Sequence, residues 1–169
     1  MRPRMVINPK RARDVLEARL RHVLSPEVLG RFSSAQAPKV VLGFPTDEPP
    51  FYVAVDEVPE GIEASGGATV GHLGMSFPLR VWLFASHRRL KTASDALIDY
   101  ATVAMASVLA DQQLDGTVDK AVPSLSGTAT GADSSRRYIA AGTLTIQCTV
   151  SSVCPAEIKE AVIESNGEN

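Results

Sequence analysis

The segment 77–85 is the clearest β-strand pattern in this 169-residue sequence. Its apolar residues alternate with a period of two, which is the side-chain repeat of an extended strand. The residues on this apolar face are Phe77, Leu79, Val81, Leu83 and Ala85. The opposite face carries Arg80, Trp82 and Phe84, two of them aromatic. We therefore expect a strand that is covered at least partly on both sides.

A long alanine-rich helix is predicted after this strand, from about Thr92 to Gln113. Thr92 or Ser94 is the expected N-cap, because a hydroxyl there can accept a hydrogen bond from a free backbone N–H. Leu97, Tyr100, Ala104 and Val108 share one stripe of the helix, and neighbouring alanines allow close packing on a sheet. Asp115-Gly116 is expected to stop it. A second alternating strand is predicted at 138–150.

The N-terminal third begins with a basic helix. Asn8 is a good N-cap and Pro9 suits the first helical position, whereas Ser25-Pro26 ends the pattern. Short strands are expected at 39–42, 51–55 and 117–122. The glycine-rich run 66–74 is expected to be a loop or an edge. Residues 123–137 are predicted to form a flexible polar loop that becomes fixed only on assembly, and 156–164 a turn or two of helix.

These elements predict an α+β fold, with a mostly antiparallel or mixed sheet of four to five strands, two main helices packed on it and long loops. The length suits one domain with its own core. We expect that domain to span residues 1–155, followed by a short helix and tail at 156–169.

Composition narrows the class of protein without naming an activity. A net charge of −2 excludes a surface that is cationic throughout, and 44% apolar residues argue against general disorder. No run of 18 apolar residues or secretory leader is visible, so neither a membrane span nor export is expected. Two cysteines do not make a disulfide framework. The composition therefore predicts a soluble intracellular globular domain.

The near-neutral total hides two oppositely charged blocks. Residues 1–31 carry eight basic side chains against three acidic ones, whereas residues 32–75 carry one basic against six acidic. The two blocks therefore have net charges of +5 and −5. A local field of this kind decides what a protein face attracts.

No catalytic or ligand-binding motif emerges. The three histidines stand apart, and Cys148 and Cys154 are too far apart for a zinc knuckle, so a buried Cys148 is the simpler interpretation. The glycine runs lack the phosphate-loop patterns, and no nucleophile elbow occurs. We expect a protein that is not an enzyme and holds no metal or cofactor.

Clustered charges are the remaining candidates for a function. They form a basic helix, an acidic segment and basic residues beside two strands. Each cluster is either a solvated face or a surface that contacts phosphate or an acidic neighbour. The candidate subunit-interface or lumen residues are Arg11, Arg13, Arg21, Asp56, Glu57, Glu60, Arg88, Arg89, Lys91, Arg136 and Arg137.

The order of segments resembles a known family. The basic helix and acidic segment lead to Phe-Pro-Leu-Arg-Val-Trp-Leu-Phe-Ala at 77–85, and the alanine-rich helix closes on Leu-Asp-Gly-Thr-Val at 114–118. Tyr-Ile-Ala-Ala-Gly-Thr-Leu-Thr-Ile-Gln-Cys-Thr-Val follows at 138–150. Over residues 8–150 this is similar to the tail terminator (tail completion, minor tail protein U-like) proteins of long-tailed bacteriophages.

The resemblance implies a structural virion protein, made in the host cytoplasm, with no catalytic residues. Such proteins form a ring, usually a hexamer, that caps the tail tube, ends its polymerisation and offers a docking surface to the head. The implied partners are copies of the chain, the tail tube protein, a head-tail connector or stopper, and DNA passing through the lumen. Another neck component, or a small nucleic-acid-binding module that uses the basic helix, is the alternative.

Overall fold

The structure is a computed structural model, and it describes residues 8–65, 72–153 and 156–167. These residues form four helices: α1 (Asn8–Val23), α2 (Pro26–Leu29), α3 (Leu90–Ala110) and α4 (Ala156–Gly167). They also form six strands: β1 (Lys39–Leu42), β2 (Phe51–Val55), β3 (Glu63–Ser65), β4 (His72–His87), β5 (Lys120–Ala132) and β6 (Tyr138–Val153).

The strands make one mixed sheet in the order β1-β2-β4-β6-β5, with β3 paired to β4. β1 and β2 are parallel, and the other pairs are antiparallel. β4 and β6 pair over their full 16 residues, from His72 opposite Val153 to His87 opposite Tyr138. At about 3.4 Å per residue, this ribbon is roughly 50 Å long. The expected α+β class with a mixed sheet is confirmed, with one strand more than the four to five predicted.

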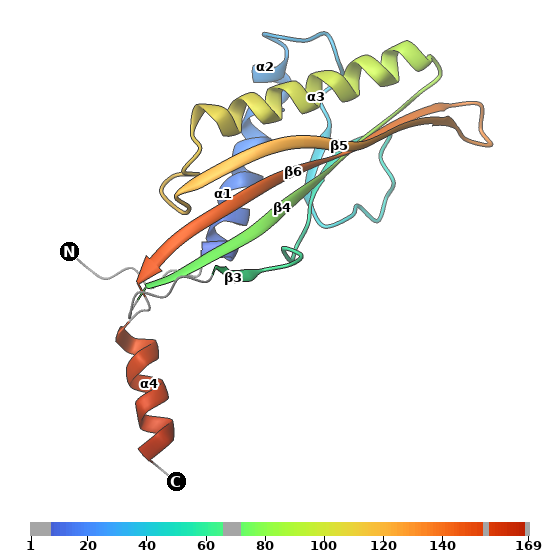
Figure 1. Ribbon diagram of the computed structural model, residues 1–169. Helices are drawn as coiled ribbons and strands as arrows, with labels where there is room; N and C mark the ends of the chain where they lie inside the picture. The colour runs from blue at the N-terminus through green and yellow to red at the C-terminus, as the bar shows by residue number, and fades with distance from the viewer. Residues whose placement is uncertain (1–7, 66–71, 154–155, 168–169) are drawn as a thin grey trace.

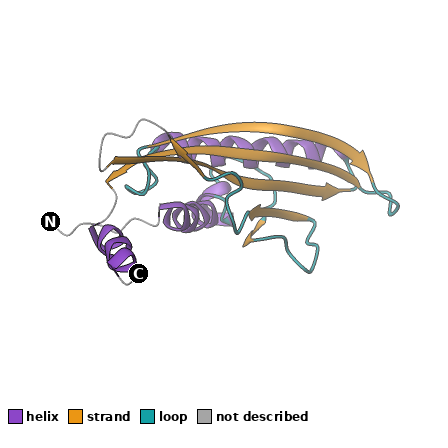
Figure 2. Cartoon of the chain, turned by 60° about the horizontal axis from the view of Figure 1, so that its bottom comes forward, coloured by secondary structure: helices purple, strands orange, loops and turns teal. Residues whose placement is uncertain are grey.

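α1 and α3 pack on the same face of the sheet and bury the core between them and the strands (Figure 1). The alternating apolar residues of β4 predicted to share one face are all buried there. Leu16, Leu20 and Leu24 form the buried stripe of the N-terminal helix. Figure 2 shows the long strands running side by side along α3, with α4 apart from the sheet.

The opposite face of β4 is partly covered, as its sequence predicts. The Phe44 ring lies 5.4 Å from that of Trp82, and Tyr52 of β2 stacks on Phe84 at 4.8 Å between ring centroids. Trp82 Nε1 donates a hydrogen bond of 2.6 Å to Asp56. These contacts come from β2 and the segments flanking it, so this face of the sheet carries loops and aromatic rings instead of helices.

Small residues bring α3 close to the sheet. Its buried residues are Ala93, Ala96, Leu97, Tyr100, Ala101, Ala104 and Val108. By length and composition alone α3 could also cross a membrane. Since this apolar stripe packs on β4, β5 and β6, core packing accounts for its composition.

Both ends of α3 differ from the prediction. The helix begins at Leu90, and Arg89 occupies the N-cap position without a side-chain hydrogen bond. Ser94 lies inside the first turns, where its hydroxyl donates to the Leu90 carbonyl, so it does not cap the helix. The helix ends at Ala110 instead of Gln113, because Asp111 leaves the helical conformation with φ −148° and ψ 81°. Leu114 and Asp115 then adopt positive φ angles of 44° and 56° in the turn that follows.

The prediction of a flexible loop at 123–137 is wrong for most of its length. β5 continues to Ala132, and its partners on β6 run from Thr149 opposite Lys120 to Tyr138 opposite Ala132. The small polar residues therefore form a long edge strand with an irregularity between Ser126 and Ala129. The segment contains few large apolar side chains because most of its residues are exposed at the edge of the sheet. Only residues 133–137 of this segment lie outside the strand.

The remaining predictions fall near the observed elements. The strand expected at 138–150 extends to Val153, the C-terminal helix extends to Gly167, and the strand expected at 117–122 begins at Lys120. In the glycine-rich run, residues 66–71 lie outside the described residues and 72–74 begin β4. Cys154 also lies outside them, whereas Cys148 is fully buried as expected, and burial raises the pKa of its thiol to about 12.

Candidate assembly surfaces

The basic helix and the acidic segment lie side by side within one subunit. Arg13 of α1 donates a hydrogen bond of 2.6 Å to the backbone carbonyl of Glu57 and also pairs with Asp14. Arg21 pairs with Glu17, one helical turn away, and Arg11 is exposed. The +5 and −5 blocks therefore meet inside the chain, whereas the interface role of these residues stays a prediction.

The acidic residues after β2 also have partners in the same chain. Asp56 accepts the indole hydrogen bond of Trp82, and Glu60 forms an ion pair with Arg80. Glu57 is exposed, and its carboxylate lies so close to Gly43 that a Cβ atom would not fit there. These side chains hold the segment against the face of the sheet that carries the aromatic rings.

The β4–β6 register brings together two basic clusters that are far apart in sequence. Arg88 and Arg89 follow the last residue of β4, and Arg136 and Arg137 precede the first residue of β6. Because His87 pairs with Tyr138, all four arginines lie at one end of the sheet. We call Arg88, Arg89 and Arg136, which are exposed, the basic end.

Arg137 differs from the other three arginines because its side chain is bound within the chain. Its guanidinium donates to the Ser86 hydroxyl at 3.0 Å and to the Ser86 carbonyl at 2.8 Å, and Ser86 is buried.

Asp133 orders the turn that precedes β6. The hydroxyl of Ser135 donates to the Asp133 carboxylate, and so does the N–H of Arg137, and these hydrogen bonds lower the pKa of Asp133.

Lys91 is not counted in the basic end, because its charge is paired with a carboxylate of the same helix. Its ammonium group lies 2.7 Å from the carboxylate of Asp95, one turn along α3. The hydrogen bond to Asp95 and the negative charge of that residue raise the pKa of Lys91. The pair is exposed, so its contribution to stability is small. Lys91 therefore adds less uncompensated charge to this end of the sheet than the neighbouring arginines do.

An apolar groove lies between α1, α2 and α3. It has a volume of about 330 Å³, and the exposed ring of Phe32 forms part of its wall. Its main lining residues are Val23, Val28, Phe32, Thr102, Val103 and Ala106. Sequence reasoning missed this surface, since it is assembled from three segments and none of them has a recognisable binding pattern.

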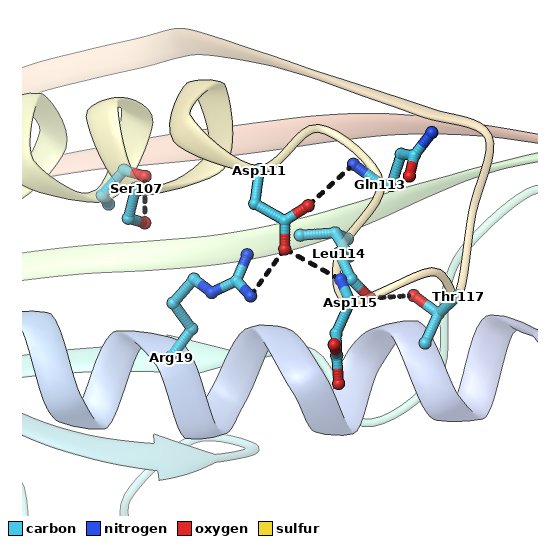
Figure 3. A network of polar contacts seen from close by, with 8 residues as sticks. Arg19, Ser107, Asp111, Gln113, Leu114, Asp115 and Thr117 are labelled. Carbon is cyan, nitrogen blue, oxygen red and sulfur yellow. Dashed lines mark hydrogen bonds and ion pairs between the residues drawn. The ribbon is translucent and has the colours of Figure 1, made fainter.

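A polar network ties α1 to the end of α3 (Figure 3). Arg19 Nη2 pairs with the Asp111 carboxylate at 2.8 Å, and the backbone N–H of Asp115 donates to the same oxygen at 2.9 Å. The Asp115 hydrogen bond and the Arg19 charge lower the pKa of Asp111. Arg19 Nη1 is buried without a partner among the described residues, so Arg19 depends on Asp111 for its pairing.

Replacing Asp111 with asparagine is expected to lower the free energy of unfolding by about 1 kcal/mol at pH 7, because the buried side of Arg19 loses its counter-charge. Since the pKa of Asp111 is lowered on folding, this contribution is present above the ordinary carboxyl pKa and is lost as the pH falls through the lowered value. Urea unfolding at pH 7 and in acid measures the difference. Asp95→Asn, which breaks an exposed pair, is the control and should change stability at most slightly.

The described residues contain no group of three or more histidine, cysteine, aspartate or glutamate side chains that could hold a metal ion. A wider hollow of about 560 Å³ lies on the sheet face opposite the helices, beside Tyr52, Phe84 and Arg137. Because the Arg137 guanidinium is already bound to Ser86, it is not available there as a free anion-binding group.

Comparison with known proteins adds no family. No model of a known protein family and no curated protein matches this chain. The fold and the surfaces described above are therefore the basis for a functional proposal.

Proposed function

We propose that this chain is a subunit of a tail terminator ring of a long-tailed bacteriophage or phage-derived particle. The ring caps the finished tail tube, stops its polymerisation and presents a surface to the head. The proposal starts from the resemblance in segment order over residues 8–150. It places the protein in the virion neck, after assembly in the host cytoplasm, with no enzymatic activity and no cofactor.

The basic end is the observation that carries the proposal. Arg88, Arg89 and Arg136 converge at one end of a ribbon about 50 Å long, far from α4 at the other end (Figure 1). In a ring, this geometry repeats the three charges once per subunit around a common axis. Such a rim attracts the phosphate backbone of passing DNA without reading its sequence.

The partners follow from the proposed position. Copies of the chain close the ring, usually a hexamer in the family it resembles. The tail tube protein lies on one side, a head-tail connector or stopper on the other, and DNA passes through the lumen. A cyclic ring uses heterologous contacts, in which two different patches of each subunit meet.

Electron microscopy of the purified protein with its polymerising tail tube protein tests the proposal. We expect rings at tube ends and tubes of limited length. Tubes that grow equally long with and without the protein would overturn it. Attachment to the head portal instead of the tube would indicate the related connector or stopper role, and tight duplex binding by a monomer would indicate a nucleic-acid-binding module.

A further inference from the structure

The C-terminal helix α4 presents exposed apolar side chains in the part that the structure describes. It extends below the rest of the molecule in Figure 1, and its described side chains, from Glu160 onward, are all exposed. Among them, Val162 is 53% exposed and Ile163 is 68% exposed. A 12-residue helix is marginal in water on its own, so packing of an apolar face is what normally stabilises it.

The apolar groove between α1, α2 and α3 is a surface on which exposed apolar residues of a helix can pack. Val28 and Phe32 on one side and Val103 and Ala106 on the other leave an open apolar channel along α3. An amphipathic helix that lays an apolar face into a groove between helices is a common recognition mode. α4 offers the exposed apolar side chains of Val162 and Ile163 to such a groove.

Charge favours the same pairing. α4 contains Glu157, Glu160 and Glu164 against Lys159, for a net charge of −2. At the groove, to which α1 contributes Val23, Arg31 beside Phe32 is exposed. Opposite potentials on two surfaces guide their approach and fix their register.

The helix cannot reach the groove of its own chain in this arrangement. A two-residue connection spans about 7 Å, which leaves the middle of α4 within roughly 16 Å of Val153. Figure 1 shows α2 and α3 at the top of the molecule and α4 below it. Between them lies the length of α1, about 24 Å for its 16 residues.

We infer that α4 of one subunit docks in the apolar groove of the next copy of the chain. Val162 and Ile163 enter the channel beside Phe32, and Glu160 and Glu164 of α4 lie near Arg31. The two surfaces differ, so the contact is heterologous and repeats from subunit to subunit until a ring closes. This inference rests on the ring assembly of the proposed function and names the contact that closes it.

Cross-linking tests the docking in the full-length chain. Cys154→Ser provides the background, since Cys148 is fully buried. One variant carries Ile163→Cys and a second carries Ala106→Cys, and they are mixed under mild oxidation. We expect a disulfide-linked heterodimer from the mixture, and higher cross-linked species from a chain that carries both substitutions. Thr130→Cys, exposed on β5, replaces Ala106→Cys in the matched control and should give at least tenfold less product.

Cross-links only within single chains would overturn the inference, because the occupant would then be the subunit's own helix. Equal yields with the Thr130→Cys control, or no cross-link at all, would also overturn it. Ring-capped tubes without cross-links would refute the docking and leave the proposed function standing. Cross-linked species with uncapped tubes would refute the tail terminator role and leave the docking standing.

Discussion

Replacing Leu144 with alanine is expected to lower the free energy of unfolding by about 3 kcal/mol. Leu144 is fully buried, and it lies in β6 between Val81 of β4 and Leu125 of β5. Truncation removes apolar surface from the core and leaves a cavity that the long β4–β6 ribbon cannot close by moving one residue. Urea unfolding at 25 °C, with an unchanged dependence on denaturant, measures the loss.

Ile98→Ala is the matched control for this substitution. Ile98 lies on the outer side of α3 and is 57% exposed, so the same kind of truncation should change the free energy of unfolding by less than about 0.5 kcal/mol. A similar loss at Leu144 and Ile98 would contradict the assignment of the core to the space between α3 and the sheet.

Reversing the three charges of the basic end is expected to abolish the binding of duplex DNA at low salt. If Arg88, Arg89 and Arg136 each neutralise one phosphate, the affinity of the unaltered protein should fall by roughly 40-fold between about 50 and about 200 mM salt. The triple variant Arg88→Glu, Arg89→Glu, Arg136→Glu should show no measurable binding in this range. Fluorescence anisotropy with a short labelled duplex measures both.

Arg11→Glu, Arg21→Glu, Arg31→Glu provides the same change in net charge at three exposed positions in and beside α1 and α2. This control should keep most of the binding and its salt dependence, because none of these residues belongs to the basic end. Equal losses in the two triple variants would show that net charge, and not the basic end, attracts DNA.

Local patterns in the sequence predicted much of the fold. The period-two alternation of β4 and the apolar stripe of α3 identify both elements and their buried faces, because burial on one face imposes those periods. The sequence of β5 predicts a loop, because the residues from Ser124 to Ala132 are mostly small or polar. That segment forms a strand through its backbone pairing with β6, which its side chains do not reveal.

The candidate surfaces were harder to predict, since they depend on contacts between distant segments. The convergence of Arg88 and Arg89 with Arg136 follows from the register of β4 on β6, and a shift of that register would separate them. The sequence also assigned Arg137 to an interface or lumen, whereas its guanidinium is engaged with Ser86 in the structure. The apolar groove needs the packing of α2 on α3, which no local pattern determines.

The sixteen-residue pairing of β4 with β6 has a mechanical consequence. The end of the molecule near α4 and the end that carries Arg88 are joined by antiparallel strands that run the whole distance. A force applied between these ends acts along the strands. It therefore loads the backbone hydrogen bonds of the ribbon in shear, so that many bonds bear the force at once instead of breaking one after another. Such a subunit resists stretching along its long axis and keeps the spacing of its two ends constant under tension.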